Sequence, residues 1–66
     1  MKTELCLRTR AGDRVVGSAV MAGQVDLADA VNRPEALALA TAHAPHHTGP
    51  FVAADYGCYW TRQDCR

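Results

Sequence analysis

Polar and apolar side chains alternate along the first residues, and this alternation constrains the fold more than any other feature of the sequence. A period of two over residues 2–9 predicts a β-strand with one buried face. Residues 11–13, Ala-Gly-Asp, have turn chemistry, and residues 14–21 predict a second strand. Because the connection is short, residues 2–21 are expected to form an antiparallel hairpin. Gly17 inside the second strand predicts a bulge or a close backbone approach.

Two prolines bound the helical part of the chain, residues 26–44. A proline inside a helix costs about 3 kcal/mol, whereas in the first turn it costs almost nothing. Pro34 therefore favours a short helical turn at 26–31, followed by a second helix that starts near Pro34. Pro45 ends that helix, because the residue before a proline avoids the helical region.

A third strand is predicted at 51–60, within a strand and tail that cover 51–66. The element order is then β-β-α-β. This order predicts a small α+β domain spanning residues 1–66, with an antiparallel sheet and one helix packed on one face.

The core is expected to be weak, because much of the apolar fraction of this 66-residue chain is alanine. Small folds usually add a disulfide, a metal or a partner, and we expect at least one of these. A cytoplasmic protein keeps its cysteines mostly reduced, which is the favoured state here. The alternative is a disulfide between Cys58 and Cys65, which leaves Cys6 unpaired.

The overall composition excludes several broad classes of function. The net charge is zero, which argues against a general electrostatic footprint for nucleic acid. No apolar run is long enough to span a membrane, and the N-terminus lacks the apolar core of a signal peptide, so the expected location is the cytoplasm. The chain has six arginines, one lysine and no isoleucine, which suggests a GC-rich bacterial or phage genome.

One group of residues has the composition of a zinc site. Zinc prefers four Cys and His ligands, and the candidates here are His43, His46, Cys58 and Cys65. The spacing differs from the familiar zinc fingers, because the two cysteines are far apart and the histidines precede them. The favoured alternative is a solvated helix end without cofactor, where the dipole stabilises histidine.

The predicted hairpin carries a basic group formed by Arg8, Arg10 and Arg14. Arginines on an exposed two-stranded ribbon can contact nucleic-acid phosphates or enter a major groove. The alternative is a solvated face whose charges prevent edge-to-edge aggregation. Nucleic-acid binding through these arginines and a solvated face are therefore both left as interpretations of this basic group.

Three of the four aromatic residues lie within five positions, at Tyr56, Tyr59 and Trp60. Tyrosine and tryptophan are enriched at binding hot spots, and Arg62 follows them closely. We expect one aromatic ring in the core and at least one exposed, at a surface that binds a protein partner. The edges of so small a sheet also predict homodimerisation.

The favoured function is a non-enzymatic bacterial or phage accessory protein that binds a larger protein. The sequence has no Gly-rich phosphate loop and no HExxH motif, so no enzyme is expected. The alternative is a precursor of a modified peptide, with residues 1–48 as leader and 49–66 as core. A further alternative is a small zinc or nucleic-acid module.

Overall fold

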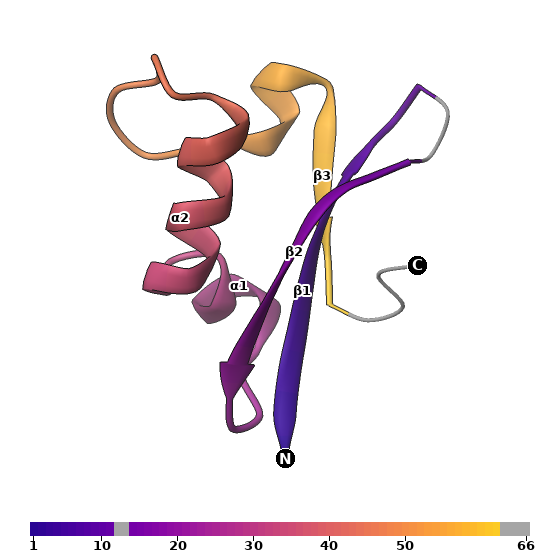
Figure 1. The fold of residues 1–66 in the computed structure, drawn as a ribbon, viewed down its shortest axis with the longest axis vertical. Coiled ribbons are helices and arrows are strands. Elements are labelled where there is room, and N and C mark those ends of the chain that lie inside the picture. Colours follow the sequence, from indigo (N-terminus) through magenta and orange to yellow (C-terminus); the bar gives the residue numbers. More distant parts are fainter. Residues whose placement is uncertain (12–13, 63–66) are drawn as a thin grey trace.

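The computed structural model describes residues 1–11 and 14–62. It contains three strands, two α-helices and one 3-10 helix, which are β1 (Lys2–Thr9), β2 (Val15–Ala22), α1 (Leu27–Ala30), α2 (Pro34–His43), η1 (Ala53–Tyr56) and β3 (Cys58–Thr61). The strands form an antiparallel sheet in the order β2-β1-β3, and all the helices lie on one side of it (Figure 1). The predicted α+β class and the β-β-α-β order are confirmed.

The N-terminal hairpin is confirmed, with β1 in the centre of the sheet. Lys2 pairs with Ala22, and the register runs without interruption to Leu7 opposite Gly17. The register shifts between Leu7 and Arg8, which is a bulge of the kind that Gly17 predicted. Part of the expected turn, residues 12–13, lies outside the described residues.

Gly17 also marks a close contact between the sheet and a side chain of α2. A Cβ atom at this position would lie 2.4 Å from Cδ1 of Leu39. The residues that α2 buries are Ala36 and Ala40, which lie one turn apart and are small. Glycine at this position therefore makes room for the Leu39 side chain, and the close approach predicted at Gly17 is made by a side chain of α2 rather than by its backbone.

The helical segment is divided at Pro34 as predicted. Asp26 occupies the N-cap position of the four-residue α1, and α2 starts at Pro34 with Arg33 as its N-cap. Neither cap side chain makes a capping hydrogen bond, so α2 depends on packing more than on its termini. No helix within the described residues has the length and apolar character needed to cross a bilayer.

The buried residues form two small clusters under the helices. One is centred on Leu5 and Met21, and the other on Leu7 and Cys58. The half-buried Trp60 packs against both clusters and joins them. Because alanines complete both clusters, the core is thin, as the composition predicted.

The third strand is shorter than predicted, because residues 53–56 form η1 and only Cys58–Thr61 extends beside β1. Asp55 N–H donates to the carbonyl of Val52, and Gly57 N–H donates to that of Ala54. Gly57 then adopts the left-handed region, with φ of 67°. These local bonds and the positive φ are incompatible with an extended chain, so the strand begins only after Gly57.

The cysteines differ from their expected state. Cys6 is disulfide-bonded, whereas Cys58 is a buried free thiol. The prediction of three reduced cysteines is therefore wrong at Cys6. The alternative, a disulfide between Cys58 and Cys65, is wrong because Cys58 is a free thiol. Cys65 lies outside the described residues. The register of the sheet is the physical reason that Cys6 and Cys58 have different surroundings. Cys58 is on the same face as the helices, and Cys6 is on the opposite face. The disulfide at Cys6 is the additional support that the thin core was expected to need.

Candidate functional site: an aromatic groove

An open groove of about 320 Å³ lies beside β3. We call it the aromatic groove, and its lining residues are Arg10, Val31, Phe51, Val52, Ala53, Ala54, Cys58, Tyr59 and Trp60. Most of them come from the segment that leads through η1 into β3. Three of the four aromatic residues of the chain meet here, so the groove combines large ring surfaces with one exposed guanidinium.

The register of β3 places its two aromatic rings. Trp60 lies opposite Leu7, so its side chain is on the face that the helices cover. Tyr59 lies opposite Arg8, on the other face. The groove therefore follows the β3 edge of the sheet, with one ring from each face. Because Trp60 also packs against both core clusters, its position is fixed before any partner binds.

The loop before η1 is held by a network around His47. The Nε2 atom of His47 lies 2.9 Å from the carbonyl oxygen of Pro50, and Tyr56 Oη lies 2.6 Å from Nδ1. A carbonyl can only accept, so Nε2 carries the proton and Nδ1 accepts the hydrogen bond from Tyr56 when the ring is neutral. The Phe51 and Tyr56 rings stack with their centroids 5.3 Å apart. These contacts orient Phe51 on the groove wall.

Cys58 and His43 form a close pair beneath the groove. The sulfur lies 3.5 Å from Nε2 of His43 and 3.4 Å from the carbonyl oxygen of Tyr56. Cys58 is only 1% exposed. A nucleophilic thiol needs access for its substrate, so this burial favours a structural role in which the thiol joins α2 to η1.

The predicted zinc ligands are only partly brought together. His43 and Cys58 are adjacent, but His46 is exposed and Cys65 lies outside the described residues. Among the residues that the structure describes, no group of three or more His, Cys, Asp or Glu side chains could hold a metal ion. Zinc normally has four ligands, and the described part of the chain provides two of them at this place.

The three predicted nucleic-acid residues have different surroundings. Arg8 donates from Nε to the Thr61 hydroxyl at 3.3 Å, across the face of the sheet. Arg10 follows the end of β1 and lines the aromatic groove. Arg14 is exposed just before β2. Of these three arginines, Arg10 is the one that lies beside the aromatic residues of the groove.

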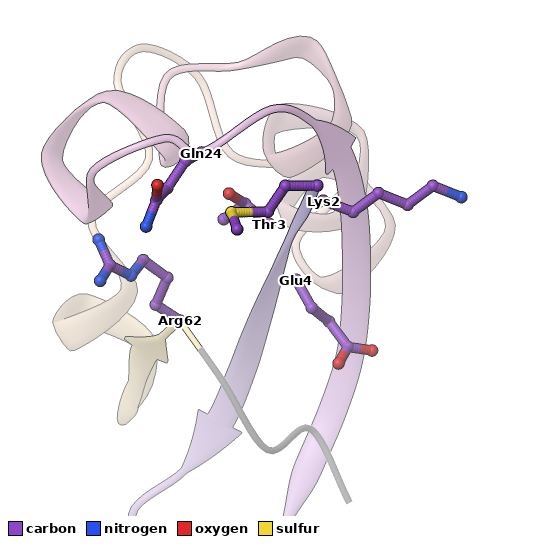
Figure 2. Close-up of a pocket in the computed structure, with 6 residues that line it drawn as sticks. Lys2, Thr3, Glu4, Gln24 and Arg62 are labelled. Carbon is purple, nitrogen blue, oxygen red and sulfur yellow. The ribbon is translucent and has the colours of Figure 1, made fainter.

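Arg62 lies outside the aromatic groove, at a polar pocket of about 250 Å³ on the N-terminal half of the sheet. Figure 2 shows the guanidinium directed toward the Gln24 amide, while the charged ends of Lys2 and Glu4 point away from each other. Arg62 also lies 3.7 Å from a carboxylate oxygen of Asp26. The charged groups of this pocket do not converge on one point, so it has no defined ligand site.

The four predicted partner-binding residues are therefore divided. Tyr59 and Trp60 line the aromatic groove, Tyr56 supports it by stacking on Phe51, and Arg62 lies elsewhere. Sequence reasoning missed Phe51 and Val52 because it assigned them to a strand. The signal that could have identified them is Gly57, which separates η1 from β3.

Comparison with family models, with curated proteins and with solved structures found no significant match to this chain.

Proposed function

We propose that this chain is a non-enzymatic binding protein that docks on a segment of a larger protein through the aromatic groove. The observation that carries the proposal is the gathering of Phe51, Tyr59 and Trp60 around one groove, with Val52 49% exposed beside them. Rings of this kind bury a large area with few rotatable bonds, which is why they dominate binding energy at interfaces.

The groove also defines the chemistry of its partner. Its wall is apolar, and the exposed Arg10 is the charged side chain among its lining residues. A partner segment that fits has a large apolar side chain for the rings and an Asp or Glu close to it for the guanidinium. The apolar contact supplies most of the affinity, and the acidic group fixes the orientation.

The groove is well prepared for binding, which supports docking over catalysis. Phe51 is held by stacking on Tyr56, and Trp60 by the core. Preorganised side chains lose little conformational entropy on binding. The thiol of Cys58 is buried and its neighbour His43 is engaged with it, so we propose no catalytic role for this pair.

A precursor with leader 1–48 and core 49–66 is less well supported. Such a core has to be accessible to modifying enzymes, and leaders are usually disordered until bound. Here Cys58 to Thr61 pair with β1, and Ala53 and Cys58 are buried in the core. The C-terminal segment is thus part of the fold up to Thr61.

We keep the cytoplasm of a bacterium, or of a phage-infected cell, as the proposed location. The disulfide at Cys6 counts against this location, because a reducing cytoplasm would keep Cys6 a thiol for most of the time, whereas an oxidising compartment would preserve the bond. Rapid alkylation of Cys6 in intact cells, followed by mass spectrometry, distinguishes the two. Unmodified Cys6 in the native protein would contradict the cytoplasmic location.

The docking proposal is tested by selecting binders from a displayed library of random peptides. The wild-type chain is the bait, and Val52→Lys is the counter-selection, because it places a charge among the rings without removing a core residue. We expect enriched peptides to share a large apolar residue with an Asp or Glu nearby. Their addition should change the fluorescence of Trp60 and shift the amide resonances of residues 51–54 and 59–60.

The matched control is Val20→Lys, which introduces the same charge at an equally exposed valine on β2. This variant should keep its peptide affinity. Peptides that bind wild type and Val52→Lys equally well, or that shift resonances only on β2, would refute docking at the aromatic groove.

A further inference from the structure

β2 is an edge strand, and past its bulge the part from Gly17 to Ala22 lacks the features that normally protect an edge. It pairs with β1 on one side, and no strand among the described residues pairs with its other side. Its sequence, Val-Val-Gly-Ser-Ala-Val-Met-Ala, contains no charge and no proline. Natural proteins usually place lysine, proline or a cover on so long an edge, because it invites pairing with another strand.

The register shows which backbone groups of β2 are unpaired. Gly23 N–H donates to the carbonyl of Met1, and the same register pairs Met21 with Thr3 and Ala19 with Leu5. In an antiparallel pair, alternate residues direct both backbone groups at the partner strand. The residues between them therefore direct their N–H and C=O groups outward, and these are Ser18, Val20 and Ala22. All three also have exposed side chains, and Val20 is 51% exposed.

We infer that β2 pairs with β2 of a second copy of this chain, antiparallel about a two-fold axis at Val20. In this register Val20 faces Val20 of the second copy, and Ser18 faces Ala22 on either side. Each of these pairs exchanges two hydrogen bonds through the outward groups. The two sheets then become one continuous sheet.

Self-complementarity favours a second copy over a foreign strand. The same small, uncharged residues meet across the axis, so the backbones can approach without steric or electrostatic repulsion. The net charge of zero removes repulsion between whole copies. Because α2 packs on β2, the pairing also places both α2 helices on the same side of the joined sheet.

This inference is independent of the proposed function, because the aromatic groove lies at the β3 edge, which is the edge of each sheet opposite to β2. A dimer formed through β2 would present two aromatic grooves. Binding to a partner that carries two matching segments would then gain avidity.

The test is the oligomeric state of the full chain, measured by native mass spectrometry and sedimentation velocity over a dilution series. Wild type should be a dimer. Val20→Lys places two like charges opposite each other, partly compensated by Glu4 beside each of them on β1, and should raise the dissociation constant about two- to fivefold. Val20→Pro removes an outward N–H that β1 does not use, so it should yield a folded monomer by circular dichroism.

Val52→Lys is the control, because it carries the same new charge far from β2 and should remain a dimer. Nuclear Overhauser contacts between labelled and unlabelled copies give the register directly. The account expects a contact between the α protons of Ala19 and Met21 across the axis. A monomeric wild type at every concentration, or an undiminished dimer in Val20→Lys, would overturn the inference. If Val20→Pro does not fold, Val20→Lys and the Nuclear Overhauser contacts decide the question.

Discussion

The contact between Gly17 and Leu39 allows one stability prediction to be worked out from the structure. In Gly17→Ala, the new methyl group would lie 2.4 Å from Cδ1 of Leu39, whereas comfortable carbon contacts are about 3.5–4.0 Å. Leu39 must change its rotamer or α2 must move outward, and such overpacking costs about 1–3 kcal/mol. Alanine also loses less backbone entropy on folding than glycine, which returns about 0.5–1 kcal/mol.

The net expectation for Gly17→Ala is a loss of up to about 2.5 kcal/mol in the free energy of unfolding. This corresponds to a melting temperature lower by roughly 4–8 °C for each kcal/mol in a domain of this size. In the Leu39→Ala background the obstructing methyl is absent, so the same substitution should be neutral or stabilising. Urea denaturation followed by Trp60 fluorescence, at one fixed protein concentration, gives the free energy of unfolding of wild type, of each single variant and of the double variant. An equal loss in both backgrounds would refute the close approach of α2 to β2.

Three other predictions concern the cysteine, threonine and histidine contacts. Reduction of the Cys6 disulfide should lower the free energy of unfolding by about 2–5 kcal/mol, and a reductant should have no such effect on Cys6→Ala. The buried hydroxyl of Thr3 donates to the carbonyl of Gly23 and accepts from the N–H of Val25. Thr3→Val should therefore lower the free energy of unfolding in urea by about 1–3 kcal/mol, whereas Thr3→Ser should keep both bonds and most of the stability. Nitrogen NMR shifts should show the proton of neutral His47 on Nε2, and Tyr56→Phe should cost no more than about 1 kcal/mol; a proton on Nδ1 would contradict the network.

The hairpin and the division of the helices were predictable from sequence because their signals are local. Alternation over residues 2–9 fixed the face of β1, and the fixed φ of Pro34 fixed the start of α2. Gly17 could be recognised as a special position, but not its contact with Leu39, because that contact joins distant parts of the chain.

The functional surface was less predictable, for two physical reasons. Residues 53–56 have weak preferences, so the 3-10 turn depends on local hydrogen bonds and on Gly57 rather than on an apolar pattern. The meeting of Arg10 with Phe51 depends on how β3 pairs with β1, which no short pattern in the sequence encodes. Sequence therefore identified Tyr59 and Trp60 as binding residues but missed Phe51, and it named Arg10 as a nucleic-acid contact rather than as the arginine beside the rings.

The central claim is that the aromatic groove binds an apolar side chain with an acidic group held by Arg10. A charge-swap cycle tests it most directly, using a peptide selected from the displayed library and its derivative with the acidic residue changed to lysine. Arg10→Glu should weaken the selected peptide about five- to tenfold, and the lysine derivative should bind Arg10→Glu better than it binds wild type. If the losses of affinity caused by Arg10→Glu and by the lysine in the peptide simply add when the two changes are combined, the acidic group does not contact Arg10. That result would contradict the account.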